Sequence, residues 1–201
     1  MADVVTAHPA VGRLNHAGYR TRQHCTAFLV GPGLALTAAH CVDGLRPGDL
    51  HLLLGYRQGA WEAHLRPTAV RPEPGGADVA ALCVDGGAPW LPMAQTPPAV
   101  GERLLVLGYG RPRVHALTAT SCTVMAYDGG GRLRLDCPLP PGASGAPVLR
   151  PTADGHEAVA VISMSSRTAS LAIRAPALAD PALCRDARSL DGATARRRSS
   201  R

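Results

Sequence analysis

Glycine and proline interrupt this 201-residue chain at short intervals along most of its length, with 22 glycines and 18 prolines. Both residues end or bend regular elements, so the composition disfavours long helices and favours short strands joined by turns. Apolar runs rich in Ala, Val and Leu lie between these breaks, without an intervening helical pattern. The expected strands span residues 25–30, 34–37, 50–54, 77–84, 103–107, 116–125, 133–137, 146–149, 158–164 and 171–174. The sequence therefore predicts an all-β barrel or sandwich.

A proline-rich stretch over residues 89–100 lies near the middle of the chain. Proline removes ladder donors and stiffens the backbone, so we expect a linker there, between one β unit over 1–88 and a second over 101–175. The Ala- and Leu-rich segment 176–187 predicts a short C-terminal helix, and residues 188–201 predict a disordered basic tail. Apolar residues make up 46% of the chain but aromatic ones only 3%, so Ala, Val and Leu must fill the core.

All 21 basic residues are arginine, and none is lysine. A Ser-Lys dyad, a phosphate-loop lysine and Schiff-base chemistry are therefore excluded. The formal net charge is +6. Residues 186–201 contribute +3 of it, because they contain five arginines and two aspartates. Because few aromatic side chains are present to stack on bases, we expect no nucleic-acid partner.

Six cysteines form an even set, which is typical of a disulfide-bonded protein from an oxidising compartment. Residues 1–6 lack the basic start and apolar stretch of a secretory signal. A signal that has been removed, a misplaced start, or an intracellular chain with free thiols would each reconcile these observations. From the cysteines we expect a secreted or periplasmic protein. We expect no membrane span, because no apolar run approaches about 18 residues.

Two short strings carry residues suited to nucleophilic catalysis. His40 lies in the string Thr-Ala-Ala-His-Cys, and Ser144 lies in Gly-Ala-Ser-Gly-Ala-Pro. A serine hydroxyl is a poor nucleophile at neutral pH unless a neighbouring base takes its proton. Imidazole is the side chain whose unperturbed pKa best suits that task. The chain is therefore interpreted as a serine hydrolase.

Both strings resemble those of the chymotrypsin-like (trypsin superfamily) serine peptidases, especially the compact bacterial members, with matching elements from about Val11 to Arg174. The histidine string is highly specific together with Cys25, which would form a disulfide with Cys41 across the histidine loop. The serine string is less specific, because the family usually has Asp before the serine and a second Gly after it. The resemblance implies two packed six-stranded antiparallel β-barrels, the first carrying the histidine and an aspartate and the second the serine. Ala143 stands where activated members carry the aspartate that pairs with a new N-terminus, so that switch is not expected.

Roles for single residues follow from the same resemblance. Asp78 opens an Asp-Val-Ala-Ala-Leu strand of the family type, and it would accept the far N–H of His40 and fix its tautomer. The backbone N–H groups of Gly142 and Ser144 would form the oxyanion hole, since glycine tolerates the positive φ that such a loop commonly requires. Ser163 would pair with the substrate backbone and donate to Asp78; a solvent-facing strand serine is the alternative.

By the same resemblance, the floor of the primary pocket is Pro138, six residues before the serine. The absence of Asp there argues against cleavage after Arg or Lys. Glutamate-specific relatives have a histidine where this chain has Ile162, and Arg167 either receives an acidic group or faces solvent. We expect a mostly apolar pocket that takes small or medium uncharged residues. The expected substrate-binding residues are Pro138, Leu139, Ser163, Met164 and Ser165, with Ala169 as a further wall.

The four remaining cysteines form two candidate pairs. Cys122 and Cys137 flank a hairpin-like pair of strands around an Asp-Gly-Gly-Gly turn, which favours a disulfide between them. Cys83 and Cys184 would be joined by analogy with the family fold, in which the terminal helix packs near the strand after the catalytic aspartate. Buried free thiols are the alternative for this pair.

Two other interpretations compete with catalysis. His24 and His40, each followed by a cysteine, would give a zinc set of two nitrogens and two sulfurs, but no Cys-x-x-Cys or His-Glu-x-x-His motif supports it. A catalytically inactive peptidase-fold binding protein is the second alternative, although all three catalytic positions hold suitable residue types. We therefore predict a monomeric serine endopeptidase that cleaves proteins or peptides through an acyl-enzyme, without metal or cofactor. The remaining histidines, His24 among them, are interpreted as structural or surface side chains.

Overall fold

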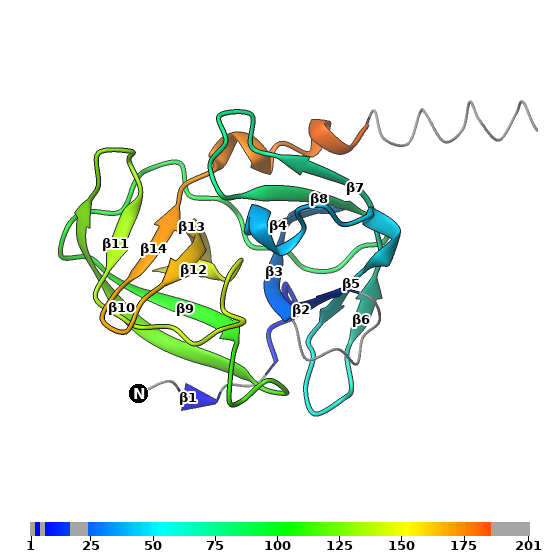
Figure 1. Cartoon of the computed structure of the whole chain (residues 1–201), viewed down its shortest axis with the longest axis horizontal. Helices are drawn as coiled ribbons and strands as arrows, with labels where there is room; N and C mark the ends of the chain where they lie inside the picture. The colour runs from blue at the N-terminus through cyan, green and yellow to red at the C-terminus, as the bar shows by residue number, and fades with distance from the viewer. Residues whose placement is uncertain (1–2, 5–6, 17–23, 186–201) are drawn as a thin grey trace, which may run out of the picture.

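Two β units lie side by side in the computed structural model of the protein (Figure 1). The structure describes residues 3–4, 7–16 and 24–185. Strands joined by turns build both units, and the named helical elements are 3₁₀ helices of three or four residues. The all-β class is therefore confirmed. Within the described ranges, no helix is long and apolar enough to cross a membrane.

The first unit is an antiparallel sheet of seven strands in the order β6-β5-β2-β3-β4-β8-β7. Its strands are β2 (Val11–His16), β3 (His24–Gly31), β4 (Leu34–Thr37), β5 (Leu50–Leu54), β6 (Ala63–Leu65), β7 (Pro67–Pro72) and β8 (Ala80–Val84). Only Arg66 separates β6 from β7, so one bent segment pairs with β5 at its start and with β8 at its end. Pro67, which has no N–H to donate, lies at this bend. The sheet is therefore a half-barrel, not the closed barrel expected, and the chain itself connects its two edge strands.

The second unit is a closed antiparallel barrel of six strands. They are β9 (Arg103–Tyr109), β10 (Leu117–Tyr127), β11 (Leu133–Leu135), β12 (Pro147–Thr152), β13 (Gly155–Ser165) and β14 (Ser170–Ile173). Strand β9 pairs with both β10 and β12, which closes the circle. Strand β1 (Asp3–Val4) pairs with β10 as a seventh strand. The start of the chain, expected in the first unit, thus extends the sheet of the second.

Mostly aliphatic side chains fill both units, as the shortage of aromatic residues requires. One buried cluster belongs to each unit, and a third has members from both and fills the junction between them. Phe28, Tyr56 and Tyr109 lie in this third cluster, and each is at most 4% exposed. Truncating a buried side chain of this size costs about 3–5 kcal/mol, so such a junction fixes the two units relative to each other.

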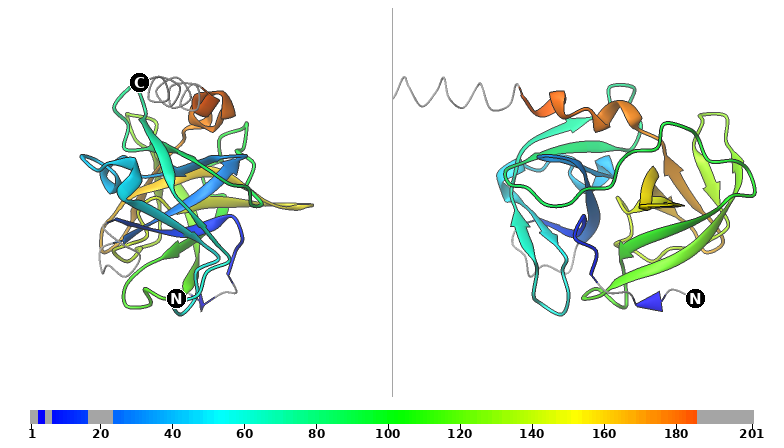
Figure 2. Two further views of the ribbon diagram at one scale, coloured as in Figure 1. Left: turned by 90° about the vertical axis from the view of Figure 1, so that its right-hand side faces the viewer. Right: turned by 180° about the vertical axis from the view of Figure 1, so that it is seen from behind.

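The proline-rich stretch connects the two units. The right panel of Figure 2, which shows the molecule from behind, displays its course. The stretch is packed along its path. Leu91 donates its N–H to the carbonyl of Leu29 on β3 at 2.9 Å, and Ala94 donates to Ala158 on β13 at 2.8 Å. Leu91 and Ala94 are both buried. The linker therefore binds to both sheets that it connects.

Two 3₁₀ helices, η3 (Pro176–Ala179) and η4 (Pro181–Cys184), replace the single C-terminal helix expected over 176–187. Pro181 has no N–H for a continuing helix, and Asp180 before it takes an extended backbone with φ −77° and ψ 116°. The Asp180 carboxylate then caps η4 by accepting the N–H of Ala182 at 2.8 Å. The end of the expected helix and the predicted tail over 188–201 lie outside the described residues.

Three disulfides join the six cysteines. The pairs are Cys25–Cys41, Cys83–Cys184 and Cys122–Cys137, with Cα–Cα distances of 6.2, 5.3 and 5.2 Å. Both bridges expected from the histidine loop and the hairpin are present. The third pair, for which free thiols were the alternative, is bonded as well. The three bridges indicate an oxidising, extracellular or periplasmic environment.

Candidate active site

Two neighbouring strands of the first unit bring His40 and Asp78 together. His40 follows β4 in the 3₁₀ helix η1 (Ala39–Cys41), and Asp78 lies just before β8. Strands β4 and β8 pair with Thr37 opposite Ala80, so the two side chains extend from adjacent strand ends. His40 Nδ1 lies 2.8 Å from Asp78 Oδ2, and the His40 backbone N–H donates to Oδ1 at 2.9 Å. The carboxylate therefore holds the histidine through both its ring and its backbone.

A third donor reaches the same carboxylate from the second unit. Ser163 Oγ, on β13, donates to Asp78 Oδ2 at 2.6 Å, and Ser163 is only 3% exposed. Partial burial raises the pKa of Asp78, but the hydrogen bonds from Ser163 and from the amide and ring of His40 outweigh burial and hold this pKa below its ordinary value. Asp78 is therefore an anion at neutral pH. It fixes a proton on His40 Nδ1 and leaves Nε2 as the basic nitrogen.

The backbone of Ser144 is held between the two units. Its carbonyl oxygen accepts the N–H of Thr26 on β3 at 2.8 Å, and the next residue, Gly145, donates to the carbonyl of Ile162 on β13 at 2.7 Å. Gly145 has a φ of +82°, and a Cβ there would lie 2.1 Å from the Thr26 carbonyl oxygen. Only glycine fits this position, which explains the Ser-Gly pair of the motif.

Two backbone amides of the serine loop are available to a ligand. Ala143 donates to Pro140 at 3.1 Å, Ala146 donates to Ala143 at 2.9 Å, and Gly145 is bonded as described. The N–H groups of Gly142 and Ser144 donate to no group in the described part of the chain. Two such donors on one tight loop are the arrangement that binds a developing oxyanion.

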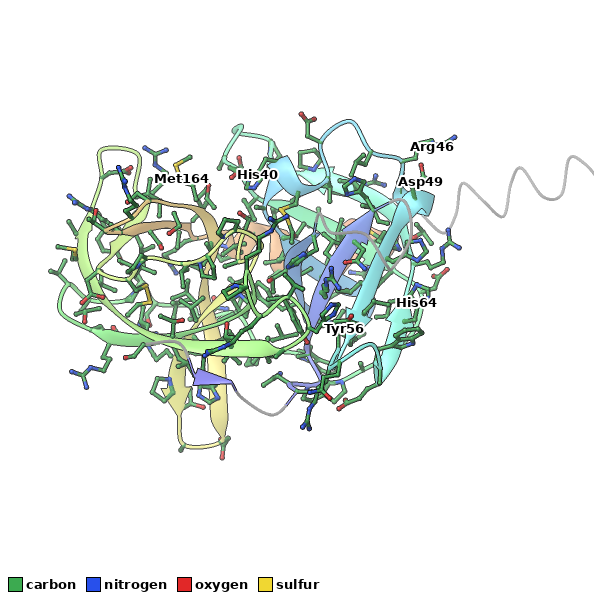
Figure 3. All side chains as sticks on the ribbon, turned by 60° about the horizontal axis from the view of Figure 1, so that its bottom comes forward. His40, Arg46, Asp49, Tyr56, His64 and Met164 are labelled. Atoms are coloured by element: carbon green, nitrogen blue, oxygen red, sulfur yellow. A yellow bond between two sulfur atoms is a disulfide. The ribbon has the colours of Figure 1, made fainter. Side chains whose placement is uncertain are left out.

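The two halves of the site face one cavity of about 600 Å³ at the junction of the units. It is lined by His40, Asp78, Leu139, Pro140, Pro141, Ala143, Ser144, Ile162, Ser163, Met164 and Ser165. Figure 3 labels His40 at this junction and Met164 on the second unit. Among the described residues no hydrogen bond joins Ser144 Oγ to His40; contacts of this kind commonly tighten only when substrate binds.

A hydrogen bond joins Leu139 to Ser165, and both residues line the cavity at Ser144. Ser165 Oγ accepts the Leu139 N–H at 2.8 Å and lies 2.9 Å from Ser170 Oγ, which donates to the Cys137 carbonyl at 2.6 Å. A neighbouring cavity of about 550 Å³ is lined by Pro138, Leu139, Pro140, Pro141, Ser165, Ser166 and Arg167.

Four of the five expected substrate-binding residues, Leu139, Ser163, Met164 and Ser165, line the cavity at Ser144. Pro138 instead lines the neighbouring cavity, together with Arg167. Sequence reasoning missed Thr26 and Ser170. No local motif marks them, because their partners Gly142 and Cys137 lie 116 and 33 positions away.

The cysteines of the alternative zinc site are not available as ligands. Ligand atoms of Cys25, His40 and Cys41 lie within 4.8 Å of one another. The two sulfurs, however, are bonded to each other in a disulfide, so neither is the thiolate that zinc requires.

A β half-barrel packed on a closed six-stranded barrel, with the candidate residues at the junction, defines a protein of the chymotrypsin fold. The model of the trypsin-like peptidase domain family matches residues 25–161, which is more than half of the chain. The chain belongs to this family. No curated protein sequence matches it.

Solved structures share the fold at low sequence identity. The protease Anisep from Arthrobacter nicotinovorans is 16% identical with a TM-score of 0.73, over 87% of this chain and 93% of that one. A thermostable serine protease, AL20, from an extremophilic microorganism is 17% identical with a TM-score of 0.68, over 83% and 91%. The serine endoprotease from Yersinia pestis is 18% identical with a TM-score of 0.67, over 84% of this chain but 60% of that one.

Proposed function

We propose that the protein is a serine endopeptidase that cleaves peptide bonds through an acyl-enzyme on Ser144. The observation that supports this most directly is the Asp78 carboxylate, which accepts three hydrogen bonds, two from His40 and one from Ser163. Three donors on one carboxylate orient the imidazole and stabilise the imidazolium that forms during proton transfer. His40 and Ser144 line the same cavity, so the oriented base and the nucleophile face one substrate.

The proposed reaction begins when His40 Nε2 takes the proton of Ser144 Oγ and the serine oxygen attacks the scissile carbonyl carbon. The negative charge that develops on the carbonyl oxygen is bound by the N–H groups of Gly142 and Ser144. The imidazolium then gives its proton to the leaving amine, and the C–N bond breaks to form the acyl-enzyme. A water molecule, deprotonated by His40, hydrolyses the ester and restores the serine.

The cavity at Ser144 supports a preference for small or medium, uncharged side chains at the residue before the scissile bond. Leu139 and Ser165 are hydrogen-bonded to each other, and both border the cavity at Ser144 and its neighbour. Arg167 lines only the neighbouring cavity, so no charged side chain among the described residues borders the primary pocket beyond the triad. A long side chain would have to displace the hydrogen bond to extend farther.

The experiment that tests this function is labelling with a fluorophosphonate, followed by peptide mapping. We expect the label on Ser144 in the folded protein, and a large loss of labelling in His40→Ala, because the base is removed. Equal labelling of both proteins would contradict the assignment of His40. A wild type that keeps its thermal unfolding transition but takes no label at all would instead support an inactive, peptide-binding peptidase scaffold.

A further inference from the structure

On the side that faces the first unit, Gly142 lies against a half-buried histidine, His24, that the proposed reaction does not use. We propose that Arg13 and His24 are positioning residues that fix Gly142, and with it the oxyanion hole, from the first unit. This inference rests on the proposed peptidase function, because it assigns the two side chains to that same site. It differs from the sequence interpretation of His24 as a merely structural or surface residue.

Arg13 is a buried cation at the junction of the two units. It lies in the middle of β2, opposite Thr26 on β3 and Leu53 on β5, and it is 2% exposed. Its guanidinium donates to Tyr56 Oη at 3.2 Å and to His24 Nδ1 at 3.4 Å, and it lies 5.2 Å from the centre of the Tyr56 ring. Arginine is always charged and only donates hydrogen bonds. The contact therefore favours a His24 ring with an unprotonated Nδ1 and its proton on Nε2.

His24 Nε2 is the nitrogen that faces the oxyanion loop. A Cβ added to Gly142 would lie 2.6 Å from His24 Nε2 and 2.8 Å from the carbonyl oxygen of Tyr109. The glycine Cα is therefore confined between the imidazole on one side and the β9 backbone on another. Gly142 has a φ of +104°, which a non-glycine residue rarely adopts.

Thr26 holds Gly142 from a third direction. Its Oγ1 donates to the Gly142 carbonyl oxygen at 3.0 Å and accepts the Tyr109 N–H, also at 3.0 Å. Thr26 and Tyr109 restrain the carbonyl end of Gly142, while His24 packs against its Cα. With all three contacts in place, the peptide before Gly142 has little freedom to rotate its N–H away from the cavity. His24 therefore acts on the direction of the first oxyanion donor.

The Arg13 contact extends into the second unit through Tyr56. Tyr56 Oη lies 2.7 Å from His115 Nδ1, and the Tyr56 carbonyl accepts the hydroxyl of Tyr109 at 2.8 Å. Figure 3 places Tyr56 near the junction of the two units. The contact between Arg13 and His24 is therefore supported by residues of both units. The fixed positive charge of Arg13 also lies behind a loop where negative charge appears only during the reaction, and low-dielectric surroundings strengthen that interaction.

The test compares His24→Phe, Arg13→Met and the double variant with the wild type. Phenylalanine keeps a ring beside Gly142 but removes the acceptor for Arg13. Steady-state cleavage of a peptide anilide, with active sites counted by fluorophosphonate titration, gives kcat and KM. Binding of a peptide boronate, which forms a tetrahedral adduct at the serine, reports the oxyanion hole. His51→Ala is the control, because His51 lies on β5 of the same sheet and contacts His64 instead of the serine loop.

We expect each single variant to lower kcat by about tenfold to a hundredfold, as small displacements of catalytic groups do. Boronate affinity should fall in parallel, with KM changed by less than about threefold. Because Arg13 acts through His24, the double variant should resemble the single ones instead of adding their effects.

Wild-type kcat and boronate affinity in His24→Phe would overturn the proposal, as would additive effects in the double variant. If Arg13→Met does not fold, His24→Phe and Arg13→Lys still test the proposal, because kcat and boronate affinity can be measured for both. In these outcomes the wild type still cleaves the anilide, so the peptidase assignment stands. A folded wild type that neither cleaves nor labels would overturn the peptidase function and this proposal together.

Discussion

Thr26 donates its backbone N–H to the carbonyl oxygen of Ser144 at 2.8 Å, a bond between a strand of the first unit and the serine loop of the second. The Thr26 side chain also donates to Gly142 in the same loop, at 3.0 Å. One residue of β3 thus fixes both the candidate nucleophile and the neighbouring candidate oxyanion donor. The geometry of the site is therefore a property of the junction and not of either unit alone.

Replacing Gly145 by alanine should disrupt this junction. The new Cβ would meet the Thr26 carbonyl oxygen at 2.1 Å and Thr37 Oγ1 at 2.3 Å, and φ is +82°. We expect a loss of several kcal/mol in the free energy of unfolding, measured with urea, together with loss of fluorophosphonate labelling. Gly101→Ala is the matched control, because its φ is +86° and nothing lies within 4 Å of the added Cβ.

In that control the backbone cost alone remains, about 1–2 kcal/mol for a left-handed alanine. Equal destabilisation by the two variants would mean that the close contact at Gly145 does not affect the free energy of unfolding.

Ten of the fourteen strands in the described residues are predicted from the sequence, whereas β1, β2, β6 and β7 are not. The predicted ranges 34–37 and 50–54 agree at both ends. Strand β2 was missed because Arg13 and Asn15 interrupt its apolar pattern, although both side chains are buried. The partners of the Arg13 side chain, Tyr56 and His24, lie 43 and 11 positions away, and no local pattern reveals such contacts.

The boundaries of the units were also hard to predict. The half-barrel depends on a bend at Arg66, and β1 pairs across units with β10. Both are long-range pairings that periodicity does not encode. His40, Asp78 and Ser144 were predicted to be catalytic because short strings around them match a family pattern, whereas Thr26 has no such string.

The hydrogen bonds on Asp78 predict a pH dependence of stability. Because the pKa of Asp78 is lower in the folded protein than its ordinary value, the carboxylate stabilises the fold above that ordinary value, about 3.9, and this contribution is lost as pH falls through the folded pKa. Wild type should therefore be more stable than Asp78→Asn at neutral pH, with the difference shrinking under acid. Urea unfolding at a series of pH values measures it.

Asp85→Asn removes an exposed aspartate and serves as the control for this series. A difference between wild type and Asp78→Asn that stays constant down to the lowest pH would contradict the expected linkage. In the same variant, kcat/KM should fall by up to about 10⁴-fold, because the imidazole loses the partner that fixes its tautomer.

Ser163→Ala should lower kcat/KM by less than Asp78→Asn does. It removes the 2.6 Å hydrogen bond to Asp78 while both bonds from His40 remain. A hydrogen bond to a charged group contributes about 1.5–3 kcal/mol, so we expect a tenfold to hundredfold loss in kcat/KM and a higher Asp78 pKa. Ser166→Ala, in an exposed turn, is the control; if both variants behave alike, the Ser163 bond does not orient the carboxylate.

The three disulfides should differ in their contribution to stability. The Cys83–Cys184 bridge spans 101 residues and connects β8 to η4, whereas Cys122–Cys137 spans 15 within the second unit. Loop entropy predicts a loss of about 4.7 kcal/mol for the first and about 3 kcal/mol for the second when each pair is replaced by alanines. Urea unfolding of the two double variants compares them directly. A greater loss from the shorter loop would show that native packing, not chain entropy, dominates.

The last prediction concerns the hydrogen bond between Leu139 and Ser165. Ser165→Gly removes the acceptor of the Leu139 N–H and the partner of Ser170, so the cavity at Ser144 should open toward the one that Arg167 lines. A peptide-library digest mapped by mass spectrometry should show the wild type cutting after small or medium, uncharged residues. The variant should accept longer side chains, acidic ones included, because the guanidinium of Arg167 becomes reachable. Adding Arg167→Ala to Ser165→Gly should remove the acidic cleavages and keep the long apolar ones. If Ser165→Gly retains the wild-type cleavage pattern, Ser165 does not set the depth of the pocket, and cleavage by the wild type after Arg would contradict the uncharged pocket itself.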